Sequence, residues 1–413
     1  MKTITYIQTE FLNILESFMH DKTYELPGDF RQIQELYKIA GKHQISAAIY
    51  EQIRTSAVME REEYRSIMKM WKHSAIRDIM LQMQRTEGFL AIYEKLCQAG
   101  LKPLVVKGLI CRNMYSKSDY RISGDEDLLL PKDNFEICDQ ILGDAGFMRE
   151  ELDMENLPYE VPYRNPRNGV YIELHMTLFS ETSDAYGHLN DEFKDVFDHC
   201  MCETIQSRKV WTLSPTDHLF YLICHSFKHF LHSGFGIRQV ADMIMMAEHY
   251  GDQIDWKNIK EKLSRLNMEY YWNALVGIGT SYLGLSFDKA CYPKDMRDQT
   301  VDHMPLLMDL LDGGIYGDSS MERKHSSNMT LTAVVGGTSN TAASLGSSLF
   351  PSKEYMKQRF EWVKKHPYLL PIGYVVRIIQ YLKSSQCKPA DEKNSIQIGM
   401  ERVELLKQYH IIK

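Results

Sequence analysis

The chain has 413 residues, of which 44% are hydrophobic and 25% charged, a composition typical of a globular protein with two or three lobes. The formal net charge of −7 argues against broad electrostatic capture of nucleic acid, which needs a basic surface, but it permits a local basic cleft. The eight cysteines are scattered without a disulfide framework, so we interpret them as reduced thiols of a cytoplasmic protein.

Neither a secretory signal nor a membrane span is predicted. The first ten residues lack the apolar core of a signal peptide. The longest apolar stretch, residues 368–376, contains Pro371 and Gly373 and is too short to span a bilayer.

Residues 1–100 predict an N-terminal helical lobe. Apolar residues recur with helical spacing between Ile76 and Cys97, and Gly100 is a helix stop signal. Four methionines belong to this region, and we expect them to face the core rather than a ligand: Met68, Met70, Met80 and Met83.

Residues 101–212 predict a small α+β domain. A strand is expected at 104–106, and Lys107-Gly108 then opens a helix that runs to residue 115. A second strand begins within Ser123-Gly124-Asp125-Glu126-Asp127-Leu128. A capping-box pattern at 133–136, with Asp133 as the cap, starts a second helix, and residues 147–151 predict a further strand.

A hairpin is predicted from the turn signal Asn168-Gly169, which separates strands at 159–164 and 171–176. Side chains alternate along a strand, so Glu173 and His175 share one face of the second arm. A carboxylate in the middle of an apolar strand needs a partner or a metal.

Asp125 and Asp127 are the strongest indication of chemistry in the chain. Two residues apart on a strand, they point the same way, and their charges repel unless a cation lies between them. Paired carboxylates of this kind hold Mg²⁺ against substrate phosphates. Glu173 is the natural third carboxylate, and the three together suggest metal-assisted phosphoryl chemistry.

This arrangement resembles the DNA polymerase β-like nucleotidyltransferase superfamily and, more narrowly, the bacterial family of uncharacterised nucleotidyltransferases. The resemblance extends from about residue 43 onward. It rests on Val106-Lys107-Gly108, Arg121 with Gly124-Asp125-Glu126-Asp127-Leu128, and Ile172-Glu173-Leu174-His175, with looser matches at 213–219, His225, 237–242 and 350–352.

The resemblance implies an α+β fold, in which a small polymerase-β-like sheet domain is flanked by N- and C-terminal helical lobes. It implies that Asp125 and Asp127 bridge two Mg²⁺ ions, and that Glu173 binds the catalytic ion and helps to deprotonate the acceptor. Contacts to the nucleotide phosphates are implied for Lys107, Gly108, Arg121 and Gly124.

Two residues depart from the family pattern. Leu109 stands where a small residue is usual after the helix-opening glycine, and Glu126 replaces the apolar residue between the aspartates. Both departures mildly favour a degenerate, noncatalytic domain over an enzyme.

Residues 213–413 predict a C-terminal helical lobe. Ser214 is a helix N-cap with Pro215 at the first helical position. Further helices are expected at 238–249, 256–266, 269–283, 352–365 and 374–384, with a flexible loop at about 321–349.

A stripe of histidines follows the first of these helices: His218, His225, His229 and His232. Its members can be zinc ligands, pocket lining or a structural polar face, and the spacing leaves all three open. Arg238 and Asp242, four residues apart, are expected to pair and buttress the site. The expected pocket lining comprises His175, His225, Arg238 and Asp242.

We therefore expect a metal-dependent enzyme that moves a nucleoside monophosphate from an NTP to an unidentified acceptor and releases pyrophosphate. A small molecule, a peptide or a protein fits the acidic chain better than RNA as acceptor. Two alternatives remain: metal-dependent phosphate-ester hydrolysis, and a noncatalytic protein that binds a nucleotide or a partner.

Overall fold

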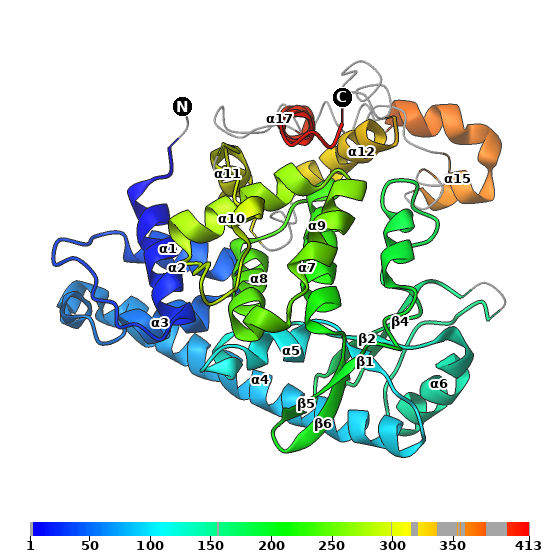
Figure 1. Cartoon of the computed structure of the whole chain (residues 1–413), viewed down its shortest axis with the longest axis horizontal. Coiled ribbons are helices and arrows are strands. Elements are labelled where there is room, and N and C mark those ends of the chain that lie inside the picture. Colours follow the sequence, from blue (N-terminus) through cyan, green and yellow to red (C-terminus); the bar gives the residue numbers. More distant parts are fainter. Residues whose placement is uncertain are drawn as a thin grey trace.

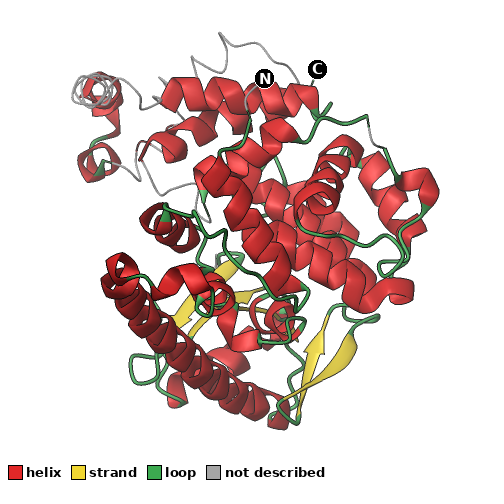
Figure 2. Ribbon diagram, turned by 90° about the vertical axis from the view of Figure 1, so that its left-hand side faces the viewer, coloured by secondary structure: helices red, strands yellow, loops and turns green. Residues whose placement is uncertain are grey.

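The computed structural model describes residues 3–154, 157–298, 300–314, 321–336, 353, 356, 360–376 and 395–412. Helices make up most of this part of the chain, and the strands gather in the lower part of the molecule (Figures 1 and 2). Six strands form one mixed sheet, so the α+β class is confirmed. The division into lobes at residues 100 and 212 stays a prediction.

The N-terminal helices precede the sheet, and they are α1 (Tyr6–Met19), α2 (Ile33–Lys42), α3 (Ser46–Ile53) and α4 (Arg65–Gln98). Helix α4 runs past the strands in Figure 1. It is tied to the sheet by Tyr93, whose hydroxyl donates to the Pro103 carbonyl (2.9 Å) and accepts from the Trp211 N–H (2.8 Å). The predicted helix and its stop are confirmed, and Gly100 has a φ of +86°.

The prediction that the α4 methionines face the core is wrong for three of the four, whereas Met68 is partly buried and packs against the core. Met70, Met80 and Met83 are 49%, 64% and 53% exposed. The buried stripe of α4 instead includes Trp71 and Phe89. A 34-residue helix that packs along one face leaves its remaining apolar residues on the outside.

The sheet has the strand order β3-β4-β2-β1-β6-β5. The strands β2 and β4 pair in parallel, as do β1 and β6, and the other pairs are antiparallel. The strands span β1 (Leu104–Val105), β2 (Glu126–Leu129), β3 (Glu160–Arg164), β4 (Tyr171–His175), β5 (Met201–Ile205) and β6 (Arg208–Thr212).

The hairpin β3–β4 confirms the prediction from Asn168-Gly169, and Gly169 adopts a φ of +70°. Because Arg164 pairs with Tyr171, the connection is longer than a two-residue turn. The strand predicted at 147–151 is wrong, since only Met148 forms a single bridge there. The sequence interpretation also missed β5 and β6.

Two helices lie between the first strands, and they are α5 (Gly108–Asn113) and α6 (Phe135–Asp144). The predicted capping box of α6 is wrong. Residues 132–134 form a short 3-10 turn, which moves the N-cap to Asn134, and that residue makes no side-chain capping bond.

The C-terminal helices are α7 (Pro215–Leu231), α8 (Ile237–Tyr250), α9 (Trp256–Arg265), α10 (Glu269–Tyr282), α11 (Met304–Gly313), α12 (Met321–Gly336), α15 (Glu361–Lys365) and α17 (Ser395–Gln408). The N-cap of α7 is confirmed, because the Ser214 hydroxyl accepts from the Asp217 N–H. The predicted loop at 321–349 is wrong over α12. Residues 337–349 lie outside the described residues, as do most of 352–360 and all of 377–384.

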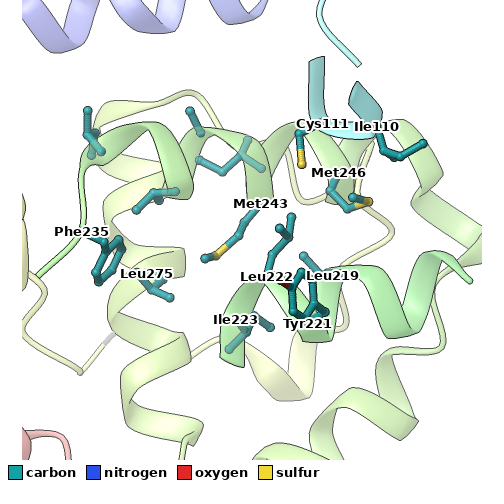
Figure 3. Close-up of a cluster of buried hydrophobic side chains, with 14 of the residues drawn as sticks. Ile110, Cys111, Leu219, Tyr221, Leu222, Ile223, Phe235, Met243, Met246 and Leu275 are labelled. Carbon is teal, nitrogen blue, oxygen red and sulfur yellow. The ribbon is translucent and has the colours of Figure 1, made fainter. Parts of the chain in front are cut away.

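Apolar side chains of α5, α7 and α8, together with Phe235 and Leu275, form one part of the buried core (Figure 3). Ile110 and Cys111 of α5 approach α8, where Met246 is fully buried, while Leu219 and Ile223 of α7 are buried beside them. No helix among the described residues is both long and apolar enough to cross a membrane.

Candidate functional site

A cavity of about 240 Å³ lies between the sheet and helices α7 and α8. Ten of the residues expected from the sequence line it, namely Lys107, Gly108, Arg121, Asp125, Asp127, Glu173, His175, His225, Arg238 and Asp242. Gly124 is not among the lining residues, although its neighbours Ser123 and Asp125 are. The structure thus gathers residues that are up to 135 positions apart in the chain.

The parallel pairing of β2 with β4 creates the acidic centre of this cavity. Asp127 is in register with Glu173, and His175 follows two residues later on the same face. One ligand atom from each of Asp127, Glu173 and His175 lies within 4.8 Å of the others. The Nε2 atom of His175 is 3.3 Å from Oδ1 of Asp127 and 3.9 Å from Oε2 of Glu173.

This cluster differs from the expected triad of Asp125, Asp127 and Glu173. The imidazole of His175, which was expected only to line the pocket, stands beside Asp127 and Glu173. Asp125 lines the same cavity outside the cluster. Carboxylate oxygen and imidazole nitrogen are both common ligands of divalent ions. Among the described residues this is the one group of three such side chains close enough to share an ion.

The ionisation of the two clustered carboxyl groups differs sharply. Burial, together with the charges of Asp127 and Asp125, raises the pKa of Glu173 to about 8. Burial also opposes ionisation of Asp127, but Lys107 and His175 outweigh it and hold the pKa of Asp127 well below its usual range. Asp127 is therefore a permanent anion, whereas Glu173 needs a cation nearby to ionise at neutral pH.

The donor atoms fit a metal ion. Asp127 and His175 are 1% and 3% exposed. Apart from the ion pair with Lys107, Oδ2 of Asp127 has no partner among the described residues, and Nδ1 of His175 has no hydrogen bond there. Buried polar atoms that lack hydrogen-bond partners indicate a site in which a bound ligand supplies the missing contacts.

Lys107, expected to contact phosphate, lies against Asp127. Its Nζ atom is 3.0 Å from Oδ1 and 2.9 Å from Oδ2 of Asp127, and 3.4 Å from Nε2 of His225. Burial opposes its charge, but the carboxylates of Asp127 and Asp125 raise the pKa of Lys107 well above its usual value. The ammonium group is therefore charged and held at the acidic centre.

Glu126, the unusual residue between the aspartates, has a structural role on the opposite face of β2. Its carboxylate accepts from the Leu109 N–H (2.7 Å) and from Nη1 of the buried Arg112 (2.6 Å). A Cβ atom at Gly108 would lie 2.1 Å from Oε2 of Glu126, so this close approach requires glycine. The Leu109 N–H, at the start of α5, therefore donates to Glu126 and not to a nucleotide phosphate, which was the expected partner of this helix start.

Arg121 is paired with Asp242 across the buried wall of the cavity. Its Nε donates to Oδ1 of Asp242 (3.1 Å), its Nη2 donates to Oδ2, and the Tyr115 hydroxyl adds a bond of 2.9 Å. Asp242 was expected to pair with Arg238. Arg238 instead donates to the Ile122 carbonyl (2.6 Å).

The histidine stripe divides into two residues outside the cavity lining, His218 and His232, and two that line the cavity; Nε2 of His232 lies 3.0 Å from the Tyr186 hydroxyl. The ring of His218 lies 2.9 Å from the Val106 carbonyl and 3.2 Å from the Thr212 hydroxyl, which makes it a structural residue. His225 and His229 line the cavity, with their Nε2 atoms 3.2 Å apart. Burial and Lys228 lower the pKa of His229 to about 3, so its ring is neutral.

The sequence interpretation missed Lys228 and Tyr159. Lys228 of α7 lines the cavity, donates to the Tyr159 hydroxyl (3.2 Å), and has a pKa that burial lowers. Its position three residues after His225 places it on the face of α7 that carries the pocket histidines, and this spacing was the available signal.

A family model described as "Uncharacterised nucleotidyltransferase" matches residues 30–276, which include all six strands and helices α2 to α9. The match covers more than half of the chain, and the protein belongs to this family of nucleotidyltransferases. Neither a curated protein nor a solved structure matches the chain.

Proposed function

We propose that the protein is a metal-dependent nucleotidyltransferase of the polymerase-β-like type, which moves a nucleoside monophosphate from an NTP to an acceptor and releases pyrophosphate. The observation that carries the proposal is the buried cluster of Asp127, Glu173 and His175, beside Asp125, in a member of a nucleotidyltransferase family. We expect Mg²⁺ to serve as the ion, in a cytoplasmic protein.

In the proposed reaction the acceptor oxygen attacks the α-phosphorus, the bond to the bridging oxygen breaks, and pyrophosphate leaves. Asp127, Glu173 and His175 would hold the divalent ion, and the ion would supply charge neutralisation of the triphosphate and favour ionisation of the acceptor. Glu173 is proposed as the base that takes up the acceptor proton, because its carboxyl group lies in the same cavity, beside Asp127 and His175. Most of the catalysis is positioning and charge stabilisation.

The phosphate contacts are proposed for the helix side of the cavity. Lys228 of α7 and Arg238 of α8 both line it. Of the residues expected to bind phosphate, Arg121 is engaged by Asp242, and Glu126 occupies the N–H group beside Gly108. We therefore assign Arg121 and Gly108 to shaping the site, and Lys228 and Arg238 to the triphosphate.

The second candidate function is a noncatalytic protein that binds a nucleotide or a partner. It is favoured by the ion pair of Lys107 with Asp127, which partly neutralises a residue that an enzyme needs as a metal ligand. The convergence of Asp125, Asp127 and Glu173 in one cavity favours the enzyme, because carboxylates that line one site repel each other unless a cation binds among them.

Incubation of the pure protein with each NTP, a divalent ion and cell extract tests the proposal. Label transfer with pyrophosphate release should be lost in the Asp125→Asn/Asp127→Asn variant. It should be kept in Asp144→Asn, which changes an exposed aspartate at the end of α6. Turnover to orthophosphate without an acceptor would indicate hydrolysis, and NTP binding unchanged by the double variant would favour the noncatalytic protein.

A further inference from the structure

Lys107 is held in place from several directions. Its backbone lies between β1 and α5, where the Val106 N–H donates to the Asp127 carbonyl (3.1 Å) and the Ile110 N–H donates to the Lys107 carbonyl (2.8 Å). Its side chain is only 17% exposed. The ammonium group therefore cannot move far without losing both its burial and its ion pair.

The partners of the ammonium group saturate its donors. Its Nζ atom lies 3.0 and 2.9 Å from the two oxygens of Asp127 and 3.4 Å from Nε2 of His225. An ammonium group can only donate, so this nitrogen of His225 must be the acceptor. His225 is itself 3.2 Å from His229, which places the ammonium group at the end of a chain of side chains from α7.

Asp127 consequently has two kinds of neighbour, the Lys107 ammonium group and the ligand-forming side chains of His175 and Glu173. Nε2 of His175 is 3.3 Å from its Oδ1, and Glu173 completes one ion position there. Two-metal sites place a second divalent ion about 3.5–4 Å from the first, sharing the bridging carboxylate. In this protein a positive charge, the ammonium group of Lys107, already lies 2.9 Å from Oδ2 of Asp127.

We propose that the ammonium group of Lys107 occupies one of the two cation positions of the site, so that the protein binds one divalent ion there rather than two. Asp127, Glu173 and His175 would hold that ion, and His225 positions the lysine. The inference rests on the proposed function for its meaning in catalysis, but the number of bound ions is independent of any transfer reaction.

A lysine in this position changes the behaviour of the site in a specific way. The positive charge of the lysine is present whenever the protein is folded, whatever the concentration of free metal ions. Removal of the charge should open the second position, because the carboxylate of Asp127 would lose its cationic partner and could bind a further ion. The unusual expectation is that loss of an active-site residue increases metal binding.

The test counts Mn²⁺ ions per chain by electron paramagnetic resonance of free Mn²⁺, on the full-length protein, with and without a non-hydrolysable NTP analogue. The wild-type protein and Lys107→Arg, which keeps the charge, should each bind one ion. Lys107→Met should bind one ion more. Asp127→Asn should lose binding, and circular dichroism checks that each variant is folded.

Two ions bound by the wild-type protein would overturn the inference, and this result needs no variant to fold. Equal numbers for wild type and a folded Lys107→Met would overturn it as well. A wild-type protein that binds one ion but transfers no nucleotide would contradict the proposed function and leave this inference standing.

Discussion

Replacement of Glu126 by leucine tests whether this unusual acidic residue is structural. Its carboxylate neutralises Arg112, which is 1% exposed and also bonded to Thr86 (3.1 Å). Removal of one partner of a buried ion pair leaves an uncompensated charge and costs about 3–5 kcal/mol. We expect Glu126→Leu to lower the free energy of unfolding by that amount. Replacement of both partners, Arg112→Leu/Glu126→Leu, should recover much of the loss.

Urea unfolding followed by circular dichroism measures these differences. The matched control is Glu136→Leu, an exposed glutamate on α6, which should change the unfolding free energy by less than about 0.5 kcal/mol. Mn²⁺ affinity of a folded Glu126→Leu protein should equal that of wild type, because Glu126 faces away from Asp125 and Asp127. A loss below about 1 kcal/mol, or additive losses in the double variant, would refute the assigned role.

Three further predictions concern the same region. The pKa of Glu173 is raised to about 8 without an ion, so its carboxyl group must lose a proton in order to bind metal below that pH. The apparent Mn²⁺ affinity, measured by calorimetry, should therefore rise from pH 6 to pH 8. Glu173→Gln should flatten this rise. Gly108→Ala should lower the free energy of unfolding by about 1–3 kcal/mol, because the new Cβ atom would collide with Glu126. The control Gly143→Ala should not, because the space around its Cβ atom is open. Equal melting temperatures for the two variants would contradict this. Arg121→Met should lower the free energy of unfolding in urea by about 3–5 kcal/mol, because it leaves Asp242 buried without its cation. If Arg121→Met loses no more stability than Arg121→Lys, the ion pair does not have the assigned role.

The local part of the site could be predicted from the sequence, because alternation along a strand depends only on neighbours. Asp125 with Asp127, and Glu173 with His175, were placed on shared faces in this way. The pairing of Asp127 with Glu173 was inferred through the family resemblance. Residue spacing alone does not determine which parallel strands become neighbours.

The features that the sequence interpretation missed depend on tertiary contacts or unusual turns. The β5–β6 turn uses Gln206 and Ser207 with φ of +47° and +66°, so no glycine or asparagine marks the hairpin. The pair of Arg121 with Asp242 joins residues 121 positions apart. The position of Lys107 against Asp127 likewise follows only from the folded backbone.

The most direct test of the proposed function is a comparison of NTP labelled in the α-phosphate with NTP labelled in the γ-phosphate, in the presence of Mg²⁺ and cell extract. The proposed mechanism predicts that α-label appears on the acceptor and γ-label appears in pyrophosphate, and that both signals disappear in Asp127→Asn. Appearance of γ-label on the acceptor, or α-label transfer that persists in Asp127→Asn, would contradict nucleotidyl transfer at this site.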